Sequence, residues 1–290
     1  MPSSAARDIS YAHSAQTRAG RAVIRAMENS TGRLRLIKRA AGYHSDLAEG
    51  RDFWDVMIAR YGLSLDVRAG ALDALPKSGP LIVIANHPYG ILDGLMLGHI
   101  LSRARSDFRI LAHQVFGKAD GLDEVILPIS FENSKAATRL NLQTRKTALD
   151  YLSGGGAIGI FPGGTVSTAA RPLGLPLDPG WRTFTAKLVA KSGATVVPVY
   201  FDGHTSRLFQ LASHVHATLR MGLLINEFRS RVDRPVRVAI GAPIAHDALE
   251  ARQKDPRAMM DFLRKSTYEL AQDPIDGNQF GLEFDTTFRA

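Results

Sequence analysis

The sequence has no cysteine, and no apolar run in it is long enough to cross a membrane. Without cysteine the chain can form no disulfide, no thiolate nucleophile and no cysteine-ligated zinc or iron–sulfur site. Every apolar run is shorter than the roughly 18 residues that a membrane-spanning helix needs, and residues 1–16 lack the apolar core of a secretory signal. Any contact with a membrane is therefore expected at its surface.

Positive charge is in excess and is concentrated near the start of the chain. The 290 residues include 36 Lys and Arg against 28 Asp and Glu, a formal charge of +8. Between Arg18 and Arg39 the only acidic residue is Glu28, and most of the excess lies there. A basic protein is attracted to nucleic acid, anionic lipid or acidic partners. This segment is typical of an amphipathic helix on anionic lipid and, equally, of the solvated face of a packed helix.

Short apolar runs separated by segments of helical spacing predict an α/β fold, a layered sheet flanked by helices. Helices are expected over residues 12–29, 139–152 and 180–192, and apolar side chains from Phe53 to Tyr61 recur at helical spacing and are expected to face the core. The predicted strands are residues 63–67, 81–85, 110–112, 125–129, 157–161, 195–200 and 236–240.

The most informative segment is residues 86–94, Asn-His-Pro-Tyr-Gly-Ile-Leu-Asp-Gly, directly after the predicted strand 81–85. Sites of α/β proteins lie at strand ends. His87 is suited to accept a proton from an attacking hydroxyl near neutral pH, and Asp93 to fix its tautomer and stabilise the imidazolium. The alternative is that both side chains only cap the following helix.

A second segment, residues 161–167 (Phe-Pro-Gly-Gly-Thr-Val-Ser), leaves another predicted strand through glycines. Such a turn lets backbone N–H groups approach the oxyanion of an acyl-transfer transition state, and Thr165 and Ser167 add hydroxyl donors. The alternative is a tight turn without a ligand. Gly154, Gly156 and Gly159 have the spacing of a dinucleotide fingerprint, but a strand follows them instead of a helix, so we reject that site.

Together these segments carry a family resemblance. Four blocks occur in the order found in the lysophospholipid (glycerolipid) acyltransferases, the family of the 1-acylglycerol-3-phosphate acyltransferases. They are the His/Asp box at 86–93, a phosphate-binding block near 127–129 with the basic helix after it, the Phe-Pro-Glu-Gly-Thr block at 161–165, and a Val-Val-Pro-Val block at 196–199. The resemblance covers about residues 63–245, and four ordered blocks are more specific than any one motif.

The resemblance implies a site with His87 and Asp93 as catalytic residues. The expected substrate-binding residues are Asn86, Arg139, Asn141, Arg145, Phe161, Pro162, Gly163, Gly164, Thr165, Ser167 and Pro198. The chain departs from the family in having five residues between His87 and Asp93 instead of four, and in having Gly163 and Val166 where the family has glutamate and arginine. The last two changes remove groups associated with binding glycerol phosphate.

These variants resemble the hemolysin-like branch of the family, which is similar to enzymes that acylate lyso-ornithine lipid. We therefore expect an O-acyltransferase that moves an acyl group from acyl-carrier protein or acyl-CoA to a lysolipid hydroxyl, with lyso-ornithine lipid or lysophosphatidic acid as acceptor. We expect no tightly bound cofactor.

Residues 1–62 are expected to be a basic helical extension and residues 63–290 the catalytic domain. The expected location is cytoplasmic, on the inner membrane surface.

Other functions fit the residues less well. No zinc finger, helix-turn-helix or ribonucleoprotein motif supports binding to nucleic acid, and no Gly-x-Ser-x-Gly elbow supports a serine hydrolase. His214 and His216 lack neighbouring ligands, so no metal site is predicted. A non-catalytic lipid-binding or scaffolding protein of the same fold is the remaining alternative, and the intact His87 and Asp93 argue against it.

Overall fold

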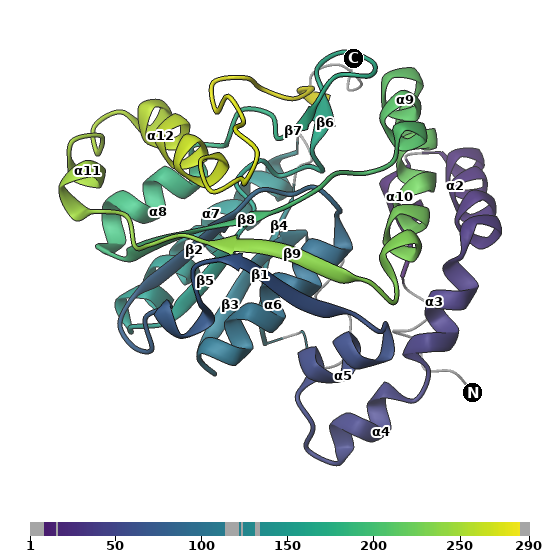
Figure 1. Cartoon of the computed structure of the whole chain (residues 1–290), viewed down its shortest axis with the longest axis horizontal. Coiled ribbons are helices and arrows are strands. Elements are labelled where there is room, and N and C mark those ends of the chain that lie inside the picture. Colours follow the sequence, from purple (N-terminus) through teal and green to yellow (C-terminus); the bar gives the residue numbers. More distant parts are fainter. Residues whose placement is uncertain (1–8, 16, 114–121, 123, 131–133, 285–290) are drawn as a thin grey trace.

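The computed structural model of the chain describes residues 9–15, 17–113, 122, 124–130 and 134–284. At its centre is a seven-stranded sheet with helices on both faces (Figure 1). The strand order across the sheet is β1-β9-β8-β2-β5-β3-β4. The strands are β1 (Ser64–Ala69), β2 (Leu81–Ala85), β3 (Phe108–His113), β4 (Ile126–Ile129), β5 (Ala157–Ile160), β8 (Thr195–Phe201) and β9 (Pro235–Ile240).

All seven strands coincide with predicted apolar runs, which confirms the predicted α/β fold. Neighbouring strands of this sheet are parallel except for β8 and β9. The strands β2, β5 and β8 therefore end at one edge of the sheet, where α/β proteins bind their ligands. A hairpin of β6 (Thr168–Ala169) and β7 (Pro176–Leu177) was not predicted, because two-residue strands are too short to show a periodicity.

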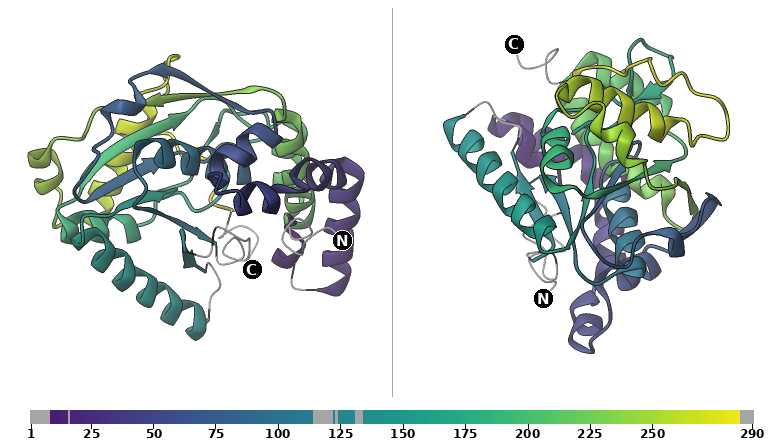
Figure 2. Two further views of the ribbon diagram at one scale, coloured as in Figure 1. Left: turned by 90° about the horizontal axis from the view of Figure 1, so that it is seen from below. Right: turned by 90° about the vertical axis from the view of Figure 1, so that its left-hand side faces the viewer.

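Helices cover both faces of the sheet, and the buried strand β2 shows how. Leu81, Val83 and Ala85 point into the core shared with α5 and α6, whereas Ile82 and Ile84 point into the core shared with α7, α8 and α12. All five side chains are fully buried, which is why β2 reads as a continuous apolar run. Figure 2 shows the long α7 (teal) lying against one side of the sheet.

The helical elements, in chain order, are η1 (Ala12–Ser14), α2 (Arg18–Thr31), α3 (Arg33–Ala40), α4 (Tyr43–Ala48), α5 (Phe53–Arg60), η2 (Leu72–Ala74), α6 (Ile91–Ala104), α7 (Lys135–Ser153), α8 (Phe184–Ser192), α9 (Arg207–Val215), α10 (Ala217–Arg231), α11 (His246–Glu250) and α12 (Pro256–Tyr268). None of the helices described is long and apolar enough to cross a membrane.

The N-terminal helices pack against the rest of the molecule. The helix predicted over residues 12–29 is divided into η1 and α2, because Thr17 accepts a hydrogen bond from the N–H of Gly20 and starts α2 there. Helix α2 lies along α10 (Figure 1). The predicted apolar stripe of α5 is confirmed, since Trp54 is buried over Gly98 of α6. The domain division at residue 62 stays a prediction, and side chains on both sides of it share one core.

Candidate active site

Two rings meet where the adjacent strands β2 and β5 end. His87 follows β2 and Phe161 follows β5, and their rings stack with centroids 4.4 Å apart. The predicted convergence of residues 86–94 and 161–167 is therefore present in the structure. Asn86 holds the neighbouring end of β8: its amide donates to the carbonyl of Phe201 (2.9 Å) and accepts from the N–H of the same residue (2.7 Å). Its contact with substrate stays a prediction.

His87 and Asp93 are in direct contact. Nδ1 of His87 lies 3.0 Å from Oδ2 of Asp93. The five-residue spacing is accommodated in the turn before α6, where Gly90 has φ of 79°, a conformation that favours glycine. Oδ2 of Asp93 also accepts the backbone N–H groups of Tyr89 (2.7 Å) and Gly90 (3.0 Å). Asp93 thus caps the helix and faces the imidazole at the same time, and its catalytic role stays a prediction.

The environments of the two side chains differ. Asp93 is fully buried, whereas the His87 side chain is 18% exposed. Burial raises the pKa of Asp93 above its ordinary value, against the opposing effect of its hydrogen bond with His87. With Nδ1 next to Asp93, the other ring nitrogen of His87, Nε2, is left as the atom suited to accept a proton. The pair has the geometry of a general base and the carboxylate that orients it.

The glycine turn beside the imidazole has unused donors. The N–H of Gly164 closes the turn onto the carbonyl of Phe161 (3.1 Å), and Gly164 has φ of 68°. Within the described residues, no hydrogen bond uses the N–H of Gly163 or of Thr165. These two groups, rather than all three of the turn, are suited to stabilise an oxyanion. The hydroxyl of Thr165 accepts a hydrogen bond from buried Arg220 (3.2 Å).

A buried carboxylate that the sequence reasoning missed joins the two segments. Oδ1 of Asp178 accepts hydrogen bonds from the N–H of His87 (3.1 Å) and the hydroxyl of Ser167, and Oδ2 accepts from Nε1 of Trp181 (2.9 Å). A Cβ at Gly163 would lie 3.2 Å from Oδ2 of Asp178, so this carboxylate fills the space beside position 163. No local pattern marks Asp178, which lies 91 residues after His87.

The N-terminal segment also reaches the site. The hydroxyl of Tyr11 lies beside Gly90, where it would be 3.1 Å from a Cβ added to this glycine. The tyrosine packs among the apolar residues around Val166. Buried Glu28 holds this segment, because its carboxylate accepts the N–H of Tyr11 and the hydroxyl of Ser10, each at 2.6 Å. Tyr11 therefore lies between the two halves of the site. Tyr11 precedes the helix expected over residues 12–29, and no local sequence pattern marks its contact with the site.

The remaining predicted site residues occupy varied positions. Ser167 is bonded within the protein, through its hydroxyl to Asp178 and its N–H to the carbonyl of His87 (2.8 Å). Pro162 is buried beside Phe161, and Pro198 lies inside β8 opposite Ile84.

The helix α7 carries the three predicted headgroup residues. Asn141 bonds both backbone groups of Ser130, and Arg139 is exposed while Arg145 is half-buried. Their roles toward a substrate stay predictions.

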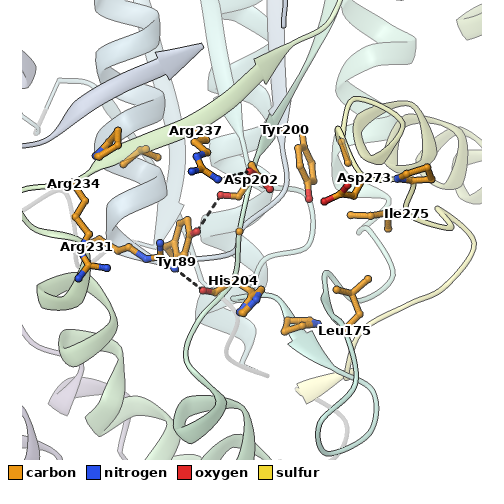
Figure 3. Close-up of a pocket in the computed structure, with 16 residues that line it drawn as sticks. Tyr89, Leu175, Tyr200, Asp202, His204, Arg231, Arg234, Arg237, Asp273 and Ile275 are labelled. Atoms are coloured by element: carbon orange, nitrogen blue, oxygen red, sulfur yellow. Dashed lines mark hydrogen bonds and ion pairs between the residues drawn. The ribbon is translucent and has the colours of Figure 1, made fainter. Parts of the chain in front are cut away.

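A cavity of about 700 Å³ lies next to the His87 loop (Figure 3). Tyr89 lines it together with three arginines from the end of α10 and the start of β9, Arg231, Arg234 and Arg237. The guanidinium of Arg231 lies 4.4 Å from the centre of the Tyr89 ring and donates to the carbonyl of His204 (2.9 Å). Three arginines and two aspartates, Asp202 and Asp273, thus line a cavity that shares a wall with the His87 loop, and Arg237 lies 3.9 Å from Asp202.

Comparisons with known proteins find similar chains. A family model described as acyltransferase matches residues 43–277. Proteins from Phocaeicola vulgatus and Bacteroides thetaiotaomicron, each named lyso-glycine lipid O-acyltransferase, are 25% identical over 229 residues, which is 76% of this chain and 78% and 80% of theirs. Among solved structures, the 1-acyl-sn-glycerophosphate acyltransferase PlsC of Thermotoga maritima matches with 17% identity and a TM-score of 0.44, covering 77% of this chain and 83% of that one.

Proposed function

The chain belongs to the acyltransferase family, as its four sequence blocks predict, and we propose that it transfers a fatty acyl group from a thioester to a hydroxyl of a lysolipid. One observation carries the mechanism: the 3.0 Å contact between Nδ1 of His87 and Oδ2 of Asp93, with the ring partly exposed beside the glycine turn. A base next to unused N–H donors suits acyl transfer to an alcohol.

In the proposed reaction, Nε2 of His87 takes the proton of the acceptor hydroxyl while its oxygen attacks the thioester carbonyl carbon. Asp93 stabilises the resulting imidazolium. The N–H groups of Gly163 and Thr165 donate to the oxyanion of the tetrahedral intermediate. When the intermediate collapses, the C–S bond breaks and the thiolate takes the proton back from His87. The products are the ester and a free thiol, and no acyl-enzyme forms.

For the acceptor, we propose a lysolipid with an amino-acid headgroup. Two relatives are named lyso-glycine lipid O-acyltransferase, which supports lyso-glycine lipid as the first acceptor to test, followed by lyso-ornithine lipid and lysophosphatidic acid. The loss of the family's glutamate and arginine at Gly163 and Val166 also favours an acceptor other than a glycerol phosphate. Acyl-carrier protein and acyl-CoA are both anionic, so the basic chain suits either donor.

Two basic regions could hold the anionic part of the acceptor. One is Arg139 with Arg145 on α7, and the other is the cavity with Arg231 and Arg237. A guanidinium matches a carboxylate or phosphate in geometry and charge. Replacing the arginine of the region that binds the headgroup, tested by Arg139→Ala for α7 and by Arg237→Ala for the cavity, should raise the KM for the acceptor. The KM for the donor should stay unchanged. The variant that leaves the acceptor KM unchanged identifies the region that does not bind the headgroup.

The function is tested by incubating the purified protein with acyl-CoA or acyl-carrier protein and each lysolipid in turn. Release of free thiol and the mass of the lipid product are measured together. We expect both signals to depend on the acceptor and to be largest for an amino-acid lysolipid. Thiol release that is independent of any acceptor, or no turnover with any donor and acceptor pair, would contradict the proposal.

We also propose that the enzyme works at the inner membrane surface, where its lipid acceptor lies.

A further inference from the structure

Exposed apolar side chains are concentrated in one region of the molecule. Nine large apolar side chains are exposed among the described residues, and five of them lie on α9 or in the turn between β6 and β7. These five are Leu173 (70% exposed), Leu175 (53%), Leu208 (61%), Leu211 (43%) and Val215 (68%), and we call them the apolar face. Scattered apolar residues are normal on a surface, but a contiguous group marks a contact with another apolar phase.

The part of this face on α9 has a regular geometry. Leu208, Leu211 and Val215 are three and four residues apart, so they lie along one side of the helix. The opposite side is already buried, since Phe209 and Ala212 pack against α10 and Val166. The helix is therefore apolar on its packed side and also apolar on its solvent side. Packing within the protein does not require the second stripe.

The turn between β6 and β7 continues the face. Leu173 and Leu175 border the same surface depression as Arg207 and Gln210 of α9, so the turn and the helix adjoin. Leu173 has φ of 68°, a left-handed conformation that a leucine rarely adopts. A strained residue at an exposed tip persists because the surrounding structure fixes it, and it prompts a hypothesis of function. Figure 1 shows this turn and α9 at the same end of the molecule.

The charged residues within the segments that carry the face have one sign. Residues 165–177 and 203–217 include no Asp or Glu, while Arg171 and Arg207 are exposed. The only acidic residue of α10, Glu227, is buried and bonded to Ser206 at the start of α9. Leu175 also lines the cavity that contains Asp202 and Asp273, on one side of the face. An apolar stripe whose own segments carry cations and no carboxylates is complementary to a bilayer that contains anionic lipid.

The face is also connected to the catalytic turn. The hairpin begins directly after residues 161–167, and Gln210 of α9 accepts the N–H of Ala169 (2.8 Å) and donates to the carbonyl of Ser167 (3.3 Å). A bilayer against the apolar face would therefore lie near the site where a membrane-borne acceptor has to arrive.

We propose that the apolar face docks on an anionic lipid bilayer, with the leucines and Val215 inserted at the headgroup boundary and Arg171 and Arg207 on lipid phosphates. The proposal rests on the proposed function only for its purpose, delivery of a lipid acceptor, and vesicle binding can be measured without turnover. It differs from an anchor made by the basic segment of α2 and α3, which can be tested separately.

The experiment is co-flotation of the full chain with vesicles of phosphatidylcholine alone or with phosphatidylglycerol. Leu208→Ser is compared with Leu142→Ser, a leucine of α7 that is 51% exposed and far from this face in the sequence. Leu173→Gly is the second test variant, because glycine adopts a positive φ freely and this change should not impair folding. Arg18→Ala with Arg21→Ala tests the rival anchor.

The wild type and Leu142→Ser are expected to bind vesicles with phosphatidylglycerol more strongly than phosphatidylcholine alone. Leu208→Ser and Leu173→Gly are each expected to lower the partition coefficient several-fold, and their combination by about tenfold or more. Turnover of a short-chain, water-soluble acceptor should remain as in the wild type. Loss of vesicle binding with intact soluble turnover supports the docking face.

Other outcomes would overturn the proposal. Equal vesicle binding by the wild type and both test variants would show that the apolar face does not bind the bilayer. Loss of binding only when Arg18 and Arg21 are replaced would show the same. A dimer in the wild type that Leu208→Ser converts to a monomer, with vesicle binding unchanged, would assign the face to a second copy of the chain. If no acceptor is turned over while Leu208→Ser still abolishes vesicle binding, the proposed function fails and the docking face stands.

Discussion

Replacing Asp93 by Asn should lower activity, and its effect on stability, relative to the wild type, should become more favourable as the pH rises. Asn keeps an oxygen that can accept the N–H groups of Tyr89 and Gly90, which are 2.7 and 3.0 Å from Oδ2 in the wild type. The cap of α6 is therefore retained. What is lost is the negative charge beside Nδ1 of His87.

The loss of activity follows from that charge. Without the carboxylate, nothing stabilises the imidazolium that forms when His87 takes a proton, and the favoured tautomer is no longer fixed. General-base catalysis contributes about 100- to 10,000-fold, so a loss of kcat in that range is expected. The KM for the acceptor should change much less, because the substitution does not alter the shape of the pocket.

The effect on stability depends on pH, and the sign of that dependence follows from the direction of the pKa shift. Burial raises the pKa of Asp93 in the folded state above 3.8, so the folded state favours the protonated carboxyl. The stability that Asp93 contributes is present below pH 3.8 and is lost as the pH rises through its raised folded pKa. An asparagine side chain at this position has no such titration. The free energy of unfolding of Asp93→Asn, relative to wild type, should therefore increase as the pH rises from about 4.

The two parts are measured by steady-state kinetics and by urea unfolding at several pH values. A folded Asp93→Asn enzyme with wild-type kcat would refute the role of Asp93. A stability difference that is the same at every pH would refute the argument from burial.

Two further substitutions test contacts that support the site. Glu28→Gln removes the charge from two 2.6 Å hydrogen bonds and should cost about 1–2 kcal/mol, with faster amide exchange at Tyr11; unchanged exchange would show that Glu28 does not hold this segment. Asp178→Asn places an amide NH2 group against the N–H donor of either Trp181 or His87 and should lower kcat about tenfold. Adding Trp181→Phe removes one of these donors and should restore part of kcat, and no recovery in the double variant would contradict this arrangement.

The sequence predicted those parts of the molecule that depend on local patterns. The seven strands of the main sheet were found because buried strands such as β2 are continuous apolar runs. A site formed by the segments of His87 and Phe161 was expected because both follow predicted strands and resemble blocks of one family. The turn from Pro88 to Gly90 was the expected place for the extra residue between His87 and Asp93, and the structure adds the path of that turn, with Gly90 at φ 79°, which spacing does not encode.

The parts that were missed depend on contacts between distant segments. Asp178 lies in a loop with no periodicity, and its three donors come from residues whose positions are set by different elements. Tyr11 precedes the helix expected over residues 12–29, and its position follows from the buried carboxylate of Glu28. Such contacts are determined by tertiary packing, and local propensities do not predict them.

The proposed mechanism depends on the imidazole of His87 deprotonating the acceptor hydroxyl, and replacing this side chain by Ala removes the base. The measurement is the initial rate of ester formation from a thioester and the preferred lysolipid, for wild type and a His87→Ala variant shown to be folded by its unfolding transition. We predict a loss of about 100-fold or more in kcat. Ester formation at the wild-type rate by the folded variant would show that His87 is not the base.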